Sequence, residues 1–406
     1  MKINLIVMIA FLLTLTVKAQ SLNDYLQIAS ENNPELKAIQ YKYESALEKV
    51  VEVGSLPNTT ISVGYFAQEV ETRVGAQKAK ISASQMLPWF GTLNAKQESA
   101  QFNAAAQLNN YEFAKRKLFL DVKTTYFELF ELNQKEQLLV ENIEILKTFE
   151  SLALNELENN RSTMVDVLKI RMEKNELLNQ LSTVQENLSA KKIAFNLLLN
   201  RDEKSTVLVV ENVNIIYSED FNKEQISDNP KLLQLENLKN ASEKSELATK
   251  KEGLPTIGIG LDYGFIENRA VENLADNGKD IVMPMVTVSF PLFSKKYSSK
   301  QKQLQLEQKA IETTKVNTYN QLQTVFENAK SKLSNSKVSI ATQIKNINEA
   351  ESAKKVLLAA YETSKIDFEQ LLEIQQLQLK FQLKKVISEK EYEIQKSTLE
   401  FLTKDN

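Results

Sequence analysis

Two long stretches of the chain carry apolar residues at the three- and four-residue spacing of a helix that buries one stripe. No glycine or proline interrupts 92–217 or 292–406. The stripe is clearest at Tyr319, Leu322, Phe326, Ala329 and Leu333 and recurs from Ile340 to Tyr361. Such spacing over many turns predicts long helices that pack side by side as in a coiled coil.

The helical pattern breaks once in each half, at 159–163 and at 363–367. Ser162, Thr163 and Asp367 suit the start of a new helix because their side chains accept hydrogen bonds from free backbone N–H groups. Each helix before a break is long enough for a rod of about 100 Å. The sequence therefore predicts two helical hairpins, formed by 92–158 with 164–200 and by 294–361 with 368–402.

Four other segments alternate apolar with polar or small residues, at about 59–70, 77–87, 255–266 and 282–291. Period-two alternation predicts half-buried strands, and about ten residues let a tilted strand cross a bilayer. Four strands cannot close a barrel, open edges are not tolerated in hydrocarbon, and small membrane barrels have about eight strands. Spanning strands would require several chains to share one barrel. A small soluble sheet packed on helices is the alternative.

If the strands span a membrane, the alternation predicts which side chains contact lipid and which face the lumen. We expect the lipid-facing set to be Ile61, Val63, Ile257, Ile259, Leu261, Val286 and Val288. We expect the lumen-facing set to be Ser82, Ser84, Gly258, Gly260 and Thr287. The aromatic residues at the strand ends, Trp89, Phe90, Phe290 and Phe293, fit an interfacial girdle. For Trp89, a buried plug in the joint between strand and helix is an equal alternative.

The two halves repeat one another. All nine glycines lie in two windows, 54–91 and 253–278, and the early Asn33-Pro34 is matched by Asn229-Pro230. Each half is predicted to hold a helix, a two-stranded insert and a long hairpin, which indicates an internal duplication. The expected organisation is a first repeat at 20–200, a linker at 201–228 with a β-type run at Val207–Val210, and a second repeat at 229–406.

The first 19 residues have the pattern of a cleaved secretory signal: Lys2, an apolar run from Leu5 to Val17, and Val17-Lys18-Ala19 before the cut. That run is shorter than the about 20 residues of a membrane helix, although a retained anchor is the alternative. No later stretch predicts a membrane helix. The chain has no cysteine, so we expect no disulfide and no lipidated cysteine.

Composition also bounds the chemistry. Histidine is absent along with cysteine, which removes the commonest bases, nucleophiles and transition-metal ligands. The 53 acidic residues are balanced by 50 Lys and Arg, giving a net charge of −3. No phosphate-binding or nucleophile motif is present. We therefore expect no enzyme activity, no cofactor, no metal site and no nucleic-acid partner.

Taken together, the chain resembles TolC-type outer-membrane efflux proteins, the exit ducts of tripartite export systems. The Asn-Pro pair of each half, Gln85-Met86-Leu87-Pro88-Trp89-Phe90-Gly91, its repeat Val288-Ser289-Phe290-Pro291-Leu292-Phe293 and the two breaks carry the resemblance. It implies a mainly helical chain with membrane strands, whose homotrimer forms a 12-stranded outer-membrane barrel above a 12-helix periplasmic tunnel.

The resemblance also implies partners and sites. The periplasmic tips would dock a membrane-fusion adaptor through Arg161, Ser162, Thr163, Lys365 and Ile366, which links the duct to an inner-membrane pump of the RND type. An acidic ring at the tip would narrow the pore and attract cations. Position by position, Glu373 matches one acidic site of that ring. Gln370 occupies the place of another, so the resemblance implies either a weaker ring or one in which Glu369 or Asp367 supplies the charge. Asp166 matches the corresponding acidic position of the first hairpin.

The expected function is a passive exit channel for small molecules or metal ions, located in the outer membrane of a Gram-negative bacterium, with lipid around its barrel and a large periplasmic part. Protein secretion through the same architecture is one alternative. A structural periplasmic coiled coil, from a different class, would explain the helices but not the paired glycine-rich strands. The cargo and the particular pump are open at this stage.

Overall fold

The computed structural model describes residues 21–159, 161–213, 215, 221–270, 273, 275–362 and 368–403. The predicted signal at 1–19 lies outside the described residues. The chain divides into two compact units. One unit comprises 1–37, 113–229 and 321–406, and is called the hairpin unit; the other comprises 38–112 and 230–320, and is called the sheet unit.

The elements follow the duplicated order expected from the sequence. The first half holds α2 (Leu22–Asn32), α3 (Pro34–Gly54), β1 (Thr60–Thr72), β2 (Gly75–Leu87), α4 (Thr92–Glu158) and α5 (Met164–Leu198). The second holds η1 (Lys223–Asp228), α6 (Pro230–Glu252), β3 (Thr256–Glu267), β4 (Ile281–Ser289), α7 (Lys296–Glu362) and α8 (Phe368–Thr403). Both α4 and α7 have 67 residues. Among the described residues, no helix has an apolar stretch long enough to cross a membrane.

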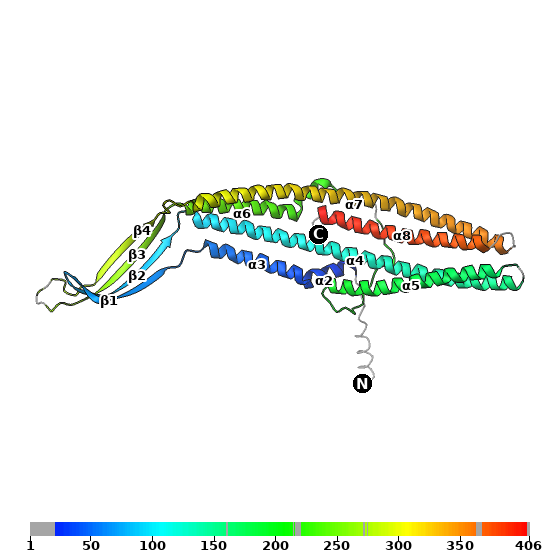
Figure 1. Ribbon diagram of the computed structural model, residues 1–406, viewed down its shortest axis with the longest axis horizontal. Helices are drawn as coiled ribbons and strands as arrows, with labels where there is room; N and C mark the ends of the chain where they lie inside the picture. The colour runs from blue at the N-terminus through cyan, green and yellow to red at the C-terminus, as the bar shows by residue number, and fades with distance from the viewer. Residues whose placement is uncertain are drawn as a thin grey trace, which may run out of the picture. The chain divides into compact units, whose positions relative to one another are not determined.

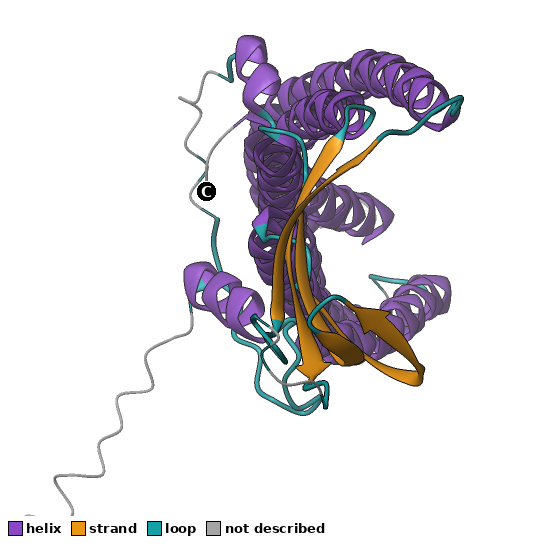
Figure 2. Cartoon of the chain, turned by 90° about the vertical axis from the view of Figure 1, so that its left-hand side faces the viewer, coloured by secondary structure: helices purple, strands orange, loops and turns teal. Residues whose placement is uncertain are grey.

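In the sheet unit, the strands form one antiparallel sheet in the order β1-β2-β3-β4, seen as a twisted ribbon in Figure 2. All four predicted strands are confirmed within three residues at each end. Val63, Ile81, Tyr263 and Val282 occupy one row across the sheet, and Ser62, Ser82, Asp262 and Met283 the next. Pairing in this register keeps the apolar positions on one face, because side chains alternate along a strand.

Along β3, the polar face of the sheet is buried and the apolar face is exposed, in the opposite sense from a water-soluble protein, whereas both faces of β1 and β4 are mostly exposed. The apolar face is bare: Val63 and Val286 expose 75% and 74% of their surface. On the polar face, Asp262 exposes only 3% and forms an ion pair with Lys80 of the adjacent strand. Side chains of β2 also crowd the polar face at Gly258 of β3, because a Cβ atom there would lie 2.6 Å from Met86 Sδ.

Four helices of the sheet unit lie in a row. The backbone carbonyl of Ala241 in α6 accepts a hydrogen bond from Ser99 of α4 at 2.8 Å, and Lys239 of α6 pairs with Glu312 of α7 at 2.6 Å. Gly54 of α3 lies against Gln97 of α4. The order is thus α3-α4-α6-α7, with α3 leading into β1 and α7 following β4, so edge helices continue edge strands.

In the hairpin unit, α5 returns along α4 and α8 returns along α7 (Figure 1). One apolar cluster joins all four helices through residues such as Leu146 of α4, Ile170 of α5, Tyr361 of α7 and Leu371 of α8. Of these, Tyr361 belongs to the apolar stripe predicted from the sequence. Ion pairs such as Lys123 with Glu400, at 2.6 Å, join α4 to α8 beyond that cluster.

The two Asn-Pro pairs make equivalent contacts in the hairpin unit. The side-chain amide of Asn33 donates to the carbonyl of Leu198, near the end of α5, at 3.4 Å. That of Asn229 donates to the carbonyl of Leu402, near the end of α8, at 3.2 Å. Each proline that follows begins a helix, where its missing N–H costs nothing.

The segment between the repeats differs from the expectation in one respect. The β-type run Val207–Val210 forms no strand, and the described regular element of 201–228 is η1. Tyrosine hydroxyls provide its hydrogen bonds: Leu208 N donates to Tyr25 Oη at 2.9 Å, and Val210 N donates to Tyr126 Oη at 3.0 Å. Side chains of α2 and α4 therefore replace the neighbouring strand that a ladder would need.

Candidate functional site

The predicted site lies at the tips of the two hairpins. In the first tip, Thr163 caps α5 and forms a capping box with Asp166. Asp166 Oδ2 accepts hydrogen bonds from Thr163 N at 2.9 Å, Thr163 Oγ1 at 2.8 Å and Ser162 Oγ at 3.2 Å. This satisfies backbone N–H groups that a helix start leaves free and places a negative charge at the positive end of α5. The cap predicted from the sequence is present.

The ionisation of Asp166 follows from these contacts. Partial burial alone would raise the pKa of its carboxyl group, but hydrogen bonds from the backbone and side chain of Thr163 and from Ser162 outweigh it. The nearby Lys169 ammonium acts in the same direction. The pKa is therefore below its ordinary value, and Asp166 keeps its charge at neutral pH.

A groove of about 360 Å³ separates the first turns of α5 and α8. Lys169 Nζ lies 2.7 Å from Glu369 Oε1, and Gln376 Nε2 donates to Glu173 Oε2 at 2.7 Å. Glu373 also lines the groove. The hydrogen bond that Lys169 donates to Glu369, with added attraction from Glu369, Asp166 and Glu373, raises the pKa of Lys169. The groove thus collects three carboxylates around one ammonium.

An aromatic junction holds the second tip against the first. Phe368, the first residue of α8, meets Phe149 of α4 and Tyr361 of α7 edge to face, each at 5.5 Å between ring centroids. Burial, and secondarily Glu156 and Asp166, raise the pKa of the Tyr361 hydroxyl. The Ser162 side chain beside that hydroxyl partly offsets the increase in its pKa. Because Phe368 contacts α4 and α7 together, its ring couples the two hairpins.

Further along the helices from the tips, a network of hydrogen-bonded polar side chains connects α4, α7 and α8. Gln375 Nε2 of α8 donates to Asn142 Oδ1 of α4 at 2.6 Å, and Lys354 Nζ of α7 donates to Gln378 Oε1 at 2.6 Å. Desolvation by burial lowers the pKa of Lys354, although Glu351 and Glu141 oppose it. Such a layer fixes the register of helices because any slip would leave buried polar groups unpaired.

The structure brings some of the predicted site residues together and leaves others apart. Glu369 and Glu373 share the groove, whereas Gln370 is exposed and Asp166 is held by its own helix cap. Arg161 of the predicted docking tip lies 4.0 Å from Glu156. Lys365, Ile366 and Asp367 lie outside the described residues.

Sequence reasoning missed Lys169, Glu173 and Tyr361. Lys169 and Glu173 are one helical turn apart on α5, as Glu369 and Glu373 are on α8, so equal spacing after the two breaks was a usable signal. The sequence predicts Tyr361 only as a member of the apolar stripe. Its place beside Ser162 and Asp166 depends on how one hairpin packs on the other, for which no local signal exists.

The predicted interfacial aromatics lie where the strands meet the helices. Phe90, Phe290 and Phe293 are exposed, while Trp89 is half-buried and packs on Phe90 at 6.2 Å between ring centroids. Three exposed rings therefore lie at the sheet-to-helix junction, and their role in an interfacial girdle stays a prediction. For Trp89, partial burial leaves both earlier alternatives open.

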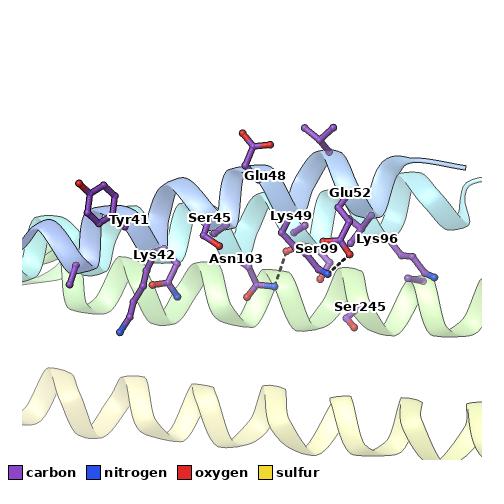
Figure 3. Close-up of a pocket in the computed structure, with 17 residues that line it drawn as sticks. Tyr41, Lys42, Ser45, Glu48, Lys49, Glu52, Lys96, Ser99, Asn103 and Ser245 are labelled. Carbon is purple, nitrogen blue, oxygen red and sulfur yellow. Dashed lines mark hydrogen bonds and ion pairs between the residues drawn. The ribbon is translucent and has the colours of Figure 1, made fainter. Parts of the chain in front are cut away.

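The sheet unit also has a groove of about 1190 Å³ between α3, α4 and α6 (Figure 3). Lys49, Ser99, Asn103 and Ser245 line it. Nearby, Lys49 pairs with Glu52 at 2.6 Å, and Asn103 donates to the carbonyl of Ser99 at 3.1 Å. Within the described ranges of the chain, no three acidic side chains gather closely enough to hold a metal ion. The groove offers no chemistry beyond polar contacts.

Comparison with known proteins agrees with this arrangement. Residues 25–201 match the family model described as Outer membrane efflux protein. No curated protein matches the chain. The outer-membrane channel OprN is similar in structure with a TM-score of 0.79 at 14% identity, covering 94% of this chain and 89% of that one.

Two further solved structures are similar. For CusC the TM-score is 0.79 at 13% identity, with 96% of this chain and 93% of that one covered. For the Campylobacter jejuni CmeC outer membrane channel the TM-score is 0.76 at 14% identity, with 94% of this chain and 85% of that one covered. The resemblance to TolC-type outer-membrane efflux proteins is confirmed, and the matching family and structures are channel proteins, not enzymes. The chain has the fold of these channels.

Proposed function

We propose that this protein is the outer-membrane exit channel of a tripartite efflux pump and works as a homotrimer. The observation that carries the proposal is the inverted sheet: Val63 and Val286 are bare on the apolar face, while Asp262 is covered on the polar face. In water such a sheet would expose a continuous apolar surface, but in a bilayer lipid covers that surface and the polar face lines a lumen.

The strands require that more than one chain share the barrel. Each chain supplies four, and β1 and β4 each have one free edge among the described residues, which hydrocarbon does not tolerate. Pairing β1 of one copy with β4 of the next removes every edge when the ring closes. The resemblance to the efflux channels favours three copies and a barrel of twelve strands.

The hairpin tips are the proposed periplasmic end. We assign the docking of a membrane-fusion adaptor to Arg161, Ser162, Thr163, Lys365 and Ile366, and the constriction to Glu373 with Asp166, Glu369, Asp367 and Gln370. Support comes from the groove where Glu173, Glu369 and Glu373 surround Lys169. Around a threefold axis these carboxylates would form an acidic ring, which attracts cations.

The proposed cargo is small molecules or metal ions, delivered by an inner-membrane pump of the RND type and conducted without chemistry by this chain. The protein would be exported by a cleaved signal, remain unlipidated and reside in the outer membrane of a Gram-negative bacterium, with its helices in the periplasm. An aromatic girdle of Trp89, Phe90, Phe290 and Phe293 would lie at the periplasmic boundary of the outer membrane.

Reconstitution tests the proposal directly. The mature protein, purified in detergent, should have the mass of three chains by light scattering and should conduct ions in planar bilayers. Conductance should be low without the adaptor and cation-selective. A monodisperse monomer that retains its full strand content would contradict the shared barrel.

A further inference from the structure

Three of the seven methionines of the chain lie in the sheet, and all three lie on its polar face. They are Met86 of β2 and Met283 and Met285 of β4. Met86 pairs with Gly258 and Met285 pairs with Gly260, two residues apart on the polar face of β3. Met283 shares that face, because alternate residues of a strand point to the same side.

Methionine supplies every large apolar side chain in this part of the polar face. Across the described strands, the three rows that hold the methionines are Met86-Gly258-Thr287, Thr60-Ser84-Gly260-Met285 and Ser62-Ser82-Asp262-Met283. The rows between them on the apolar face are Gln85-Ile259-Val286 and Ile61-Ala83-Leu261-Pro284, without methionine. Leucine fills nearly the same volume as methionine, so space alone does not explain why the polar face has sulfur.

Two glycines let the methionines of β2 and β4 approach each other over β3. A Cβ atom on Gly258 would lie 2.6 Å from Met86 Sδ, and one on Gly260 would lie 3.6 Å from Met285 Cε. The two positions are about 6–7 Å apart along the strand. Neither glycine has a side chain that could stand between Met86 and Met285. Because methionine has three rotatable side-chain bonds, both sulfur atoms can turn toward one ion.

We propose that Met86 and Met285, with Met283 beside them, form a transit site for a soft monovalent cation such as Cu(I) or Ag(I). The inference rests on the proposed function, in which the polar face lines the lumen, and it specifies one class of metal-ion cargo. Thioether sulfur is a soft ligand that selects Cu(I). The expectation of no metal site followed from the absence of histidine and cysteine, and methionine is the soft ligand that remains.

Neutral sulfur ligands suit passage of an ion better than storage. A thiol must lose its proton before it binds a metal, whereas a thioether has none to lose. Asp262, in the row of Met283, forms an ion pair with Lys80, so its charge is already balanced and gives little attraction for Mg²⁺ or Ca²⁺, which prefer oxygen ligands. A conducting site must bind strongly enough for entry and weakly enough for release.

Silver binding to the purified trimer tests the site, with Ag(I) in chloride-free buffer as the probe. Met86→Leu with Met285→Leu removes two thioethers and keeps most of the volume. Met164→Leu with Met172→Leu, both on α5, removes the same number elsewhere and is the matched control. Equilibrium dialysis should show Ag(I) binding weakened about tenfold or more in the first double variant, because losing a ligand costs at least as much as losing its outer-shell support. The control should bind as the wild type does.

Methyl resonances identify the residues without any substitution that could disturb folding. In a wild-type trimer labelled with carbon-13 at the methionine methyl groups, the signals of Met86, Met283 and Met285 should shift at lower Ag(I) concentration than those of Met164 and Met172. Side chains that only fill space would show no such order.

Two results would overturn the site. One is equal loss of silver binding, or none, in the two double variants; the other is a set of sheet methionine signals that Ag(I) does not move. Either result leaves the channel proposal standing if the wild type is a trimer that conducts potassium ions in planar bilayers. A wild type that is a monomer and does not conduct would refute the channel proposal itself, and the transit site with it.

Discussion

Asn229 donates its side-chain amide to the backbone carbonyl of Leu402 at 3.2 Å, so the start of the second repeat is fixed to the end of its last helix. Asn33 makes the equivalent contact with Leu198 at 3.4 Å. The two hydrogen bonds explain why both repeats place asparagine before proline: the amide ties the chain to the hairpin, and the proline starts the next helix.

Replacement of Asn229 with alanine should destabilise the hairpin unit by about 1–3 kcal/mol, because a buried carbonyl would lose its donor. Asn229 is fully buried, whereas Asn33 is partly exposed. Asn33→Ala should therefore cost less. Chemical denaturation of both variants, followed by circular dichroism, measures the difference; equal losses would show that burial does not set the cost.

Truncation of Phe368 should loosen the junction between the hairpins. Phe368→Ala removes a ring that packs on Phe149 and Tyr361, at a cost of about 3–5 kcal/mol for a buried aromatic. If the tips close the channel, basal conductance in planar bilayers should rise. Phe368→Leu keeps most of the volume and should stay near wild type. Unchanged conductance in the alanine variant would show that this junction does not control closure of the channel.

Acid should weaken the first tip through Asp166. Its pKa is lowered in the folded chain, so its stabilisation is present above the unfolded value of about 3.9 and is lost as pH falls through the folded value. Asp166→Asn should remove that part of the acid sensitivity and cost about 1 kcal/mol as a weakened cap. Hydrogen exchange at the start of α5, measured against pH, reports both effects; identical profiles for variant and wild type would contradict the assignment.

Arginine should be tolerated on one face of the sheet only. At a mid-membrane site on the apolar face, such as Val63 or Val286, it should cost about 2–4 kcal/mol, because the charge would face lipid. At Ser82 or Thr287, on the opposite face, it should cost far less. Folding into lipid vesicles from urea measures both; equal tolerance would refute the assignment of faces.

The tip carboxylates should govern ion selectivity. Glu373→Ala together with Asp166→Ala should reduce cation preference and block by added divalent ions in planar bilayers, because fewer charges would line the constriction. Each single variant, Glu373→Ala and Asp166→Ala, is compared with Glu243→Ala in α6, a control that loses the same one charge. If conductance, selectivity and block are all unchanged in the double variant, the constriction lies elsewhere.

The sequence alone determined the elements and their repetition. Strand alternation at Ile61–Tyr65, the helix break at 159–163 and the cap at Thr163 are local patterns, since each depends on residues a few positions apart. The family resemblance followed from their order and spacing. The run Val207–Val210 shows where local pattern failed, because strand propensity specifies no partner and tyrosine hydroxyls took that role.

Tertiary structure decided which distant residues meet. Nothing near Phe368 in the sequence indicates Phe149, and nothing near Lys169 indicates Glu369, because these contacts depend on how one hairpin packs on the other. Likewise, alternation predicted two faces for the sheet, but only strand register and burial showed the apolar face bare and Asp262 covered. Short-range chemistry fixed the elements, and side-chain packing between them decided which surfaces remained open for lipid and for other copies of the chain.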